Sequence, residues 1–335
     1  MERYMTWLSS QSSDGYKYDG AGTAYGDWLS FEKTDPRYVS VAYYAYDAKL
    51  MARMSRVLST APGDRYDLAA KKYDRLFDDI KTEYQRRFMP DGVLPSPSQT
   101  QCLLALQFGL YRDDAQKQWL TDKLRQLITD NGEKLGTGFV GTSVINMTLS
   151  EAGLADKAYN LLLQCDCPSW MYSIDQGATT VWERWNSYTR EKGFGDKSMN
   201  SFNHYAYGAV GEWMYRRMAG INPDDKRPGF KHIVLCPEPD MRTVVPHKQH
   251  RIKGVMGIYD SPYGDILADW VHVEDGIEYT FSVPANTTAT LYLPVADEIT
   301  AVKFTDARPE YKGFKDGRKI YELGSGDYEV KVKNY

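Results

Sequence analysis

The stretch GATTVWERWNS, residues 177–187, combines an acidic side chain with aromatic ones in a pattern that could act on a sugar. Glu183 lies between Trp182 and Trp185, and Arg184 follows it directly. Tryptophan offers a large, flat apolar face of the kind that packs against a sugar ring. A carboxylate between two such faces could carry out acid–base chemistry on a glycosidic bond. The competing interpretation is that Glu183 is only the ion-pair partner of an arginine.

Two further segments carry polar and aromatic residues that could join Glu183. The segment NSFNHYAYGAVGEW (200–213) contains His204, and the loop between it and Glu183 could bring both residues to one rim. The segment YGDWLSFE (25–32) places Asp27 and Trp28 just before the first long helical pattern. The alternatives are structural: a histidine at a helix start is often hydrogen-bonded locally, and Asp27 could merely accept backbone N–H bonds.

The glycine-rich segment TGFVGT, residues 137–142, precedes a helical pattern. A phosphate-binding loop would need a lysine and a Ser/Thr at set positions after the glycines, and no lysine follows here. We therefore predict a tight loop in which Thr142 or Ser143 caps the next helix. Backbone amides of this loop could still contact a sugar hydroxyl.

Composition excludes several other classes of function. The 335 residues carry a net charge of −4 without a long basic run, which argues against nucleic acid or an anionic membrane as partner. Apolar runs are too short to span a bilayer, and the four cysteines are too scattered for a disulfide framework or a zinc site. We therefore predict no metal and no cofactor.

The N-terminal residues MERYMTWLSS lack the apolar region of a signal peptide and predict a short amphipathic helix that is entered midway. Met1 is therefore not expected to begin a natural domain. Localisation stays open between cytoplasm and periplasm.

Hydrophobic periodicity predicts a helical part followed by a β-rich part. Apolar residues recur at helical spacing in seven segments, with Asp35 as N-cap before Pro36 and Gly220 after the last helix: 36–60, 64–88, 99–111, 114–129, 142–152, 155–164 and 201–220. Short alternating runs begin at His232 and continue to the C-terminus. We expect helical hairpins arranged as a toroid or barrel over residues 1–225, and an antiparallel β-sandwich over residues 226–335.

Several of these motifs, in this order, resemble one known family. YGDWL, TGFVGT, GATTVWERWNS, SFNHYAYGAVGEWMYRRMAGI and PGFKHIVLCP look like segments of the bacterial α-L-rhamnosidases of the six-hairpin glycosidase group. YDSPYG (259–264) and VPANTTATLYLP (283–294) are similar to the C-terminal β-sandwich of that family. The resemblance covers nearly the whole chain, and it is specific because several motifs keep their order.

This resemblance implies part of an (α/α)6 barrel followed by a β-sandwich, and hydrolysis of terminal α-L-rhamnosyl bonds with inversion. It implies that Glu183 is the general base, that His204 and Trp28 contact the sugar, and, less directly, that Asp27 belongs to the sugar-binding residues. The implied partner is a rhamnose-containing oligosaccharide or glycoside.

One part of the family pattern has no match in this sequence. The general acid of the family lies in an Asp/Arg/Glu-rich segment, and nothing here resembles it. We therefore expect little or no hydrolysis by this chain alone. The alternatives are a non-catalytic rhamnose-binding remnant, another six-hairpin glycosidase, or a fragment that needs a second copy or a partner chain to complete the barrel.

Overall fold

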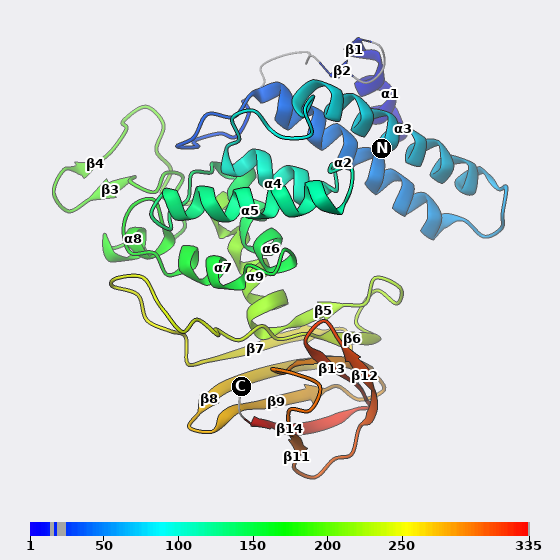
Figure 1. Cartoon of the computed structure of the whole chain (residues 1–335), viewed down its shortest axis with the longest axis vertical. Helices are drawn as coiled ribbons and strands as arrows, with labels where there is room; N and C mark the ends of the chain where they lie inside the picture. The colour runs from blue at the N-terminus through cyan, green and yellow to red at the C-terminus, as the bar shows by residue number, and fades with distance from the viewer. Residues whose placement is uncertain (14–16, 19–24, 334–335) are drawn as a thin grey trace. The chain divides into compact units, whose positions relative to one another are not determined.

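The computed structural model describes residues 1–13, 17–18 and 25–333, which divide into two compact units (Figure 1). Unit 1 consists of Met1–Lys157 and Gln164–Tyr207, and it is mainly helical. Unit 2 consists of Ala158–Leu163 and Gly208–Tyr335, and most of its elements are strands. The predicted order, helices first and strands second, is confirmed.

Unit 1 is built from helices and short two-stranded hairpins. Helix α2 packs against α3, and α4 packs against both α5 and α6. No helix in the described ranges combines the length and apolar character needed to cross a membrane. The elements are α1 (Glu2–Ser10), β1 (Ser12–Ser13), β2 (Lys17–Tyr18), α2 (Pro36–Leu58), α3 (Arg65–Phe88), α4 (Gln99–Phe108), α5 (Asp114–Asp130), α6 (Phe139–Glu151), α7 (Ala155–Leu162, shared with unit 2), α8 (Trp170–Asp175), β3 (Tyr188–Thr189) and β4 (Gly193–Phe194).

Side-chain caps explain where these helices begin. Asp35 accepts the N–H of Arg37, with Pro36 in the first turn of α2 as predicted. Ser98 and Gln101 form a reciprocal capping box at the start of α4. Each cap satisfies amides that the helix itself leaves without a partner, and typically stabilises a helix by about 1 kcal/mol.

The last predicted helix, residues 201–220, is shorter and less regular than expected. A 3₁₀-helix (Ala206–Ala209), the single turn α9 (Val210–Trp213) and a π-helix (Met214–Ala219) replace it, and Gly220 ends it with a φ of 88°. Residues 201–204 are not helical, because Ser201 and His204 form backbone hydrogen bonds with Glu183 and Val181 instead.

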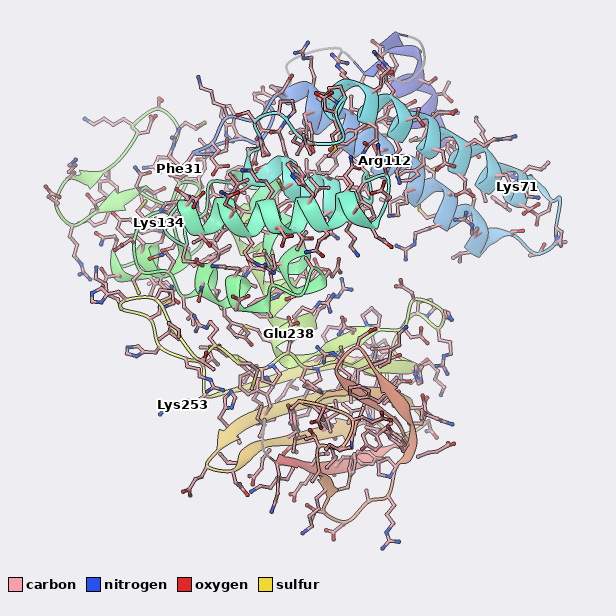
Figure 2. The ribbon with its side chains drawn as sticks, in the orientation of Figure 1. Phe31, Lys71, Arg112, Lys134, Glu238 and Lys253 are labelled. Carbon is pink, nitrogen blue, oxygen red and sulfur yellow. The ribbon has the colours of Figure 1, made fainter. Side chains whose placement is uncertain are left out.

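The loop before α2 docks on the loop before α6. The N–H groups of Phe31 and Glu32 both donate to the carbonyl of Gly136, and Figure 2 labels Phe31 and Lys134 on these two loops. The N–H of Phe139 donates to the carbonyl of Trp28 at 2.9 Å. A Cβ atom on Gly138 would lie 2.1 Å from that carbonyl oxygen, so this approach requires glycine.

Unit 2 contains two five-stranded sheets. One has the order β12-β13-β10-β6-β5 and the other β11-β14-β9-β8-β7. The strands are β5 (Ile221–Pro223), β6 (His232–Leu235), β7 (Gly254–Ser261), β8 (Gly264–Val273), β9 (Gly276–Val283), β10 (Thr288–Pro294), β11 (Val302–Phe304), β12 (Glu310–Lys315), β13 (Arg318–Leu323) and β14 (Gly326–Lys333).

The expectation of purely antiparallel sheets is wrong for one pair of strands. Strands β6 and β10 are parallel, with Ile233 opposite Ala289. The chain leaves this sheet after β6, builds β7 to β9 of the other sheet, and returns to run beside β6 in the same direction. All other strand pairs in the two sheets of unit 2 are antiparallel.

The buried side chains of both sheets form one hydrophobic cluster. Strand β9 shows the period-two pattern clearly, since Ile277, Tyr279, Phe281 and Val283 are buried and alternate with more exposed residues. Trp270 on β8 is fully buried within the cluster, and its indole N–H donates to the carbonyl of Met218 at 2.7 Å.

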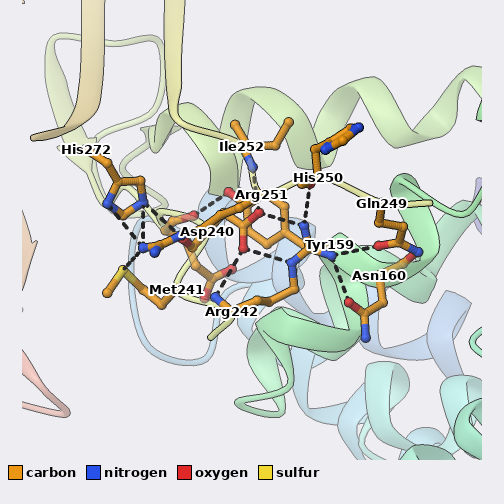
Figure 3. A network of polar contacts seen from close by, with 11 residues as sticks. Tyr159, Asn160, Asp240, Met241, Arg242, Gln249, His250, Arg251, Ile252 and His272 are labelled. Atoms are coloured by element: carbon orange, nitrogen blue, oxygen red, sulfur yellow. Dashed lines mark hydrogen bonds and ion pairs between the residues drawn. The ribbon is translucent and has the colours of Figure 1, made fainter. Parts of the chain in front are cut away.

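A buried ion pair ties the loop after β6 to the segment 158–163 within unit 2 (Figure 3). Arg242 bonds both oxygens of Asp240, at 2.8 Å through Nε and 2.7 Å through Nη2. Its Nη1 donates to Asn160 and Gln249, both at 2.8 Å. Burial acts to raise the pKa of Asp240, but Arg242 and the N–H of Ile252 outweigh it and hold this pKa below its usual value.

Replacing Arg242 by methionine should lower the free energy of unfolding by about 3–5 kcal/mol, because Asp240 would remain buried without its counter-charge. The side chains of this pair are 2% and 0% exposed. Chemical denaturation followed by circular dichroism measures the change. Arg227→Met is the matched control, since its pair with Asp224 involves a guanidinium that is 58% exposed, and its loss should cost no more than about 1 kcal/mol. Equal effects of the two substitutions would contradict this account.

Gly138→Ala should lower the free energy of unfolding of unit 1 by about 1–3 kcal/mol, because the new methyl group meets a backbone atom that no rotamer change can move away. Thermal unfolding detects the loss. Gly211→Ala in α9 is the control, since nothing lies within 4 Å of its added Cβ atom. That substitution should be neutral or slightly stabilising in a helix. An unchanged melting temperature for Gly138→Ala would show that the two loops separate easily.

Candidate functional site

Backbone pairing between two distant segments brings Glu183 close to His204. The N–H of Glu183 donates to the carbonyl of Ser201 at 2.9 Å, and the N–H of His204 donates to the carbonyl of Val181 at 2.8 Å. The N–H of Ser201 also donates to Oε2 of Glu183 at 2.8 Å. One oxygen of the Glu183 carboxylate is therefore fixed by the same segment that carries His204.

The Glu183 carboxylate is buried without a cationic partner. Glu183 is 8% exposed, and no lysine or arginine of the described chain forms an ion pair with it. Arg184 points its guanidinium elsewhere, with Nε donating to the carbonyl of Met199 and Nη2 lying 3.7 Å from Asp196. The structure thus does not support the ion-pair interpretation of Glu183. Within the described residues, Oε1 accepts no hydrogen bond from protein.

The hydrogen bonding of His204 fixes which ring nitrogen can donate. Nδ1 accepts the N–H of Ala206 at 3.3 Å, so a neutral ring carries its proton on Nε2. The ring packs against Phe139, with centroids 4.8 Å apart. His204 is only partly buried, and Nε2 has no protein hydrogen-bond partner among the described residues, so its N–H is available as a donor.

A row of aromatic rings within unit 1 continues from His204. Phe139 meets Tyr207 edge-on at 5.1 Å, and Tyr207 stacks on Trp185 at 3.9 Å. Burial raises the pKa of Tyr207, and the nearby carboxylate of Asp27 raises it further. Sequence analysis did not single out Phe139 or Tyr207. Their place in the two motifs TGFVGT and NSFNHYAYG was the only available signal.

The two tryptophans that flank Glu183 line a pocket of about 430 Å³. The other lining residues are mostly apolar or hydroxylic: Trp170, Ser173, Ile174, Ala178, Thr179, Thr180, Val181 and Tyr207. None of the four predicted site residues, Glu183, His204, Trp28 and Asp27, lines this pocket. The indole rings next to Glu183 therefore line a pocket that Glu183 itself does not line.

Asp27 occupies the N-terminus of α6. Its Oδ1 accepts the N–H groups of Val140 and Gly141 at 2.8 and 3.2 Å. Its Oδ2 accepts the N–H of Gly138 at 2.8 Å and the hydroxyl of Thr100. Asp27 is 5% exposed, and its burial raises its pKa while the four donors act in the opposite direction.

The predicted capping of this helix by Thr142 or Ser143 is wrong. Helix α6 begins three residues earlier than expected, at Phe139, and its N-cap Gly138 has no side chain to offer. The Thr142 hydroxyl instead pairs with that of Thr137 at 2.8 Å, and Ser143 donates back to the carbonyl of Val140. A carboxylate from a distant loop does the capping, which local sequence patterns cannot reveal.

The glycine spacing in this loop, GTGFVG at 136–141, is also that of a dinucleotide-binding fingerprint. That fingerprint works when a strand leads into the turn, and here the preceding element is helix α5. The amides that would hold a pyrophosphate already bind the Asp27 carboxylate. The glycines serve close packing instead, since a Cβ on Gly141 would lie 2.6 Å from Oγ1 of Thr100.

Trp28 lies on the loop that Asp27 anchors. It is partly buried, and its ring meets Tyr25 edge-on at 5.3 Å. Its carbonyl accepts the N–H of Phe139, whose ring packs against His204. The structure thus brings Trp28, His204 and Glu183 into one connected neighbourhood of unit 1, with Asp27 buried behind the loop.

Two family models match the chain in sequence order. The one described as the bacterial alpha-L-rhamnosidase six-hairpin glycosidase domain matches residues 1–218, which is more than half of the 335 residues. The one described as the bacterial alpha-L-rhamnosidase C-terminal domain matches residues 220–307.

Curated relatives and solved structures agree with these matches. An alpha-L-rhamnosidase of Streptomyces avermitilis is 36% identical over 330 residues, covering 97% of this chain and 30% of that protein. One from Formosa agariphila is 32% identical, covering 98% and 35%. The crystal structure of the Streptomyces avermitilis enzyme complexed with L-rhamnose has a TM-score of 0.85 at 35% identity, covering 99% of this chain and 30% of that one. The alpha-L-rhamnosidase structure from Dictyoglumus thermophilum gives 0.83 at 27% identity, covering 99% and 36%.

The chain therefore spans about a third of the length of the relatives it matches. Within that third, the similarity extends through both the helical and the β-rich parts. On these grounds the chain belongs to the bacterial α-L-rhamnosidase family.

Proposed function

We propose that this chain supplies the general base and part of the sugar-binding surface for the hydrolysis of terminal α-L-rhamnosides with inversion. The observation that supports the proposal is the burial and hydrogen bonding of the Glu183 carboxylate. Its carboxylate is buried, lacks a cationic partner among the described residues, and has one oxygen fixed by Ser201 while the other accepts nothing from protein. A base that must bind a water molecule needs such a free acceptor atom.

In this mechanism Glu183 draws a proton from water through Oε1. The water oxygen attacks the anomeric carbon from the face opposite the leaving group. As the new bond forms, the glycosidic bond breaks and its electron pair stays on the leaving oxygen, which takes a proton from solvent or from an acid that this chain does not supply. Inverting glycosidases hold their two carboxyl groups about 6.5–9.5 Å apart to leave room for this water. The hydrogen bond from Ser201 to Oε2 keeps Glu183 in one orientation during the transfer.

His204 and Trp28 are the proposed sugar contacts. The Nε2–H group of His204 donates to a hydroxyl of the sugar, and Nδ1 is held by Ala206. Trp28 offers a partly buried apolar ring on a loop fixed at its backbone. Such a combination, one flat apolar face with a few placed donors, is typical of sites for small polar ligands.

We also propose that this chain by itself contributes no general acid, since no segment resembles the acid-bearing one of the family. The loss of general-acid assistance typically lowers a rate by 10²–10⁴-fold.

The helices of residues 1–225 are proposed to form part of an (α/α)6 barrel, and residues 226–335 a β-sandwich. A second copy or a partner chain would complete the barrel, and a rhamnose-containing oligosaccharide or glycoside is the proposed substrate.

Glu183→Gln should slow the release of nitrophenol from 4-nitrophenyl α-L-rhamnoside by about 10²–10⁴-fold, because the amide cannot accept a proton from water. This substrate is chosen because its leaving group needs little protonation. Isothermal titration with L-rhamnose should still detect binding, since the side chain keeps its shape. Glu183→Ala with added azide should form a rhamnosyl azide of inverted configuration, which NMR identifies.

Glu191→Gln is the matched control, because Glu191 is exposed and lies in the same loop region. It should leave turnover and binding unchanged. Turnover that survives Glu183→Gln would refute the assignment of the base. Binding of rhamnose without turnover, equal in wild type and Glu183→Gln, would favour the rhamnose-binding alternative instead.

A further inference from the structure

We propose that Asp27 is a positioning residue of the rhamnoside site, which acts through Trp28 and does not itself contact the sugar. The inference rests on the function proposed above for that site. It assigns Asp27 a different task from the direct sugar contact implied by the resemblance to the family. Three features of the structure carry it.

The first feature is that the Asp27 carboxylate has no acceptor capacity left. Two carboxylate oxygens offer about four acceptor positions. Val140 and Gly141 occupy Oδ1, while Gly138 and Thr100 occupy Oδ2. With the residue 5% exposed, a sugar hydroxyl would have to displace one of these donors and leave it buried without a partner.

The second feature is that a second carboxylate anchors the other end of the same loop. Glu32 accepts the N–H of Gln99, the first residue of α4, at 2.7 Å through Oε2. Asp27 and Glu32 thus bind the N-termini of two different helices, where the helix dipole favours a negative charge. Trp28 lies between these two anchors, so its backbone is held on both sides.

The third feature is direct contact between the Trp28 backbone and the helix that Asp27 caps. The Trp28 carbonyl accepts the N–H of Phe139, the first residue of α6, at 2.9 Å. Gly138 leaves no space for the loop to shift toward the helix, because even a methyl group would collide with the Trp28 carbonyl. The position of Trp28 therefore depends on the hydrogen bonds between Asp27 and the N-terminus of α6.

The first test observes Trp28 without any ligand. The chain is labelled with 5-fluorotryptophan, and Trp28→Phe identifies the Trp28 fluorine resonance. Asp27→Asn should shift or broaden that resonance, because an amide nitrogen would then face N–H donors. Thr100→Val, which removes a single donor, should do so more weakly and serves if Asp27→Asn does not fold.

Asp64→Asn is the matched control. Like Asp27, Asp64 accepts four hydrogen bonds at a helix start, here all from backbone N–H groups, those of Thr60, Ala61, Tyr66 and Asp67. It caps α3 and has no contact with the Trp28 loop among the described interactions. Its substitution should lower stability without changing the Trp28 resonance.

The second test is a double-mutant cycle read by the affinity for L-rhamnose. Asp27→Asn should weaken binding about tenfold in the wild-type chain. In the Trp28→Ala background it should weaken binding by less than about twofold, because residues that act through one another are not additive. Measurements are made well below the melting temperature of every variant.

An additive cycle would overturn the proposal, because it would mean that Asp27 and Trp28 act on the sugar independently. An unchanged Trp28 resonance in Asp27→Asn would overturn it as well. If the wild-type chain shows no response to L-rhamnose, the proposed function of the site fails, and the Trp28 resonance still decides whether Asp27 positions Trp28.

Discussion

The helical unit depends most on one buried carboxylate at the N-terminus of α6. Asp27 accepts hydrogen bonds from three backbone amides and a threonine hydroxyl that lie 73 to 114 positions away in sequence. Unmade, each of these bonds would leave a buried polar group without a partner, which costs about 1–3 kcal/mol. The same contact holds the loop that carries Trp28. It also accounts for glycine at 138 and 141, where a Cβ would lie 2.1 Å from the Trp28 carbonyl oxygen and 2.6 Å from Oγ1 of Thr100.

Glu183 shows the opposite use of a buried carboxylate. Asp27 has all of its acceptor positions filled, whereas Glu183 has one oxygen fixed by Ser201 and one without a protein donor in the described structure. A filled carboxylate holds a structure in place, and a half-filled one retains the capacity to bind and deprotonate water. This difference separates the proposed base from the proposed positioning residue more clearly than burial does, since both side chains are nearly inaccessible.

In unit 2, a buried carboxylate is satisfied by an ion pair rather than by backbone amides. Arg242 and Asp240 are almost fully buried, and the remaining guanidinium donors are taken by side-chain oxygens and a carbonyl. A buried pair with every donor used specifies one arrangement of the 240–252 loop on the segment 158–163. The two sheets of unit 2 do not depend on a buried ion pair, because their alternating apolar residues already determine which face is buried.

The sequence by itself determined the helical and β-rich parts, most helix starts and the motifs that mark the family, because periodicity, caps and motif order are local properties. It could also name Glu183, His204, Trp28 and Asp27 as candidates. Only the tertiary structure decided that Arg184 turns away from Glu183, that β6 and β10 run parallel, and that Asp27 rather than Thr142 or Ser143 caps α6. Each of these outcomes rests on partners far apart in sequence, and local patterns carry no information about which distant group satisfies a buried donor or charge.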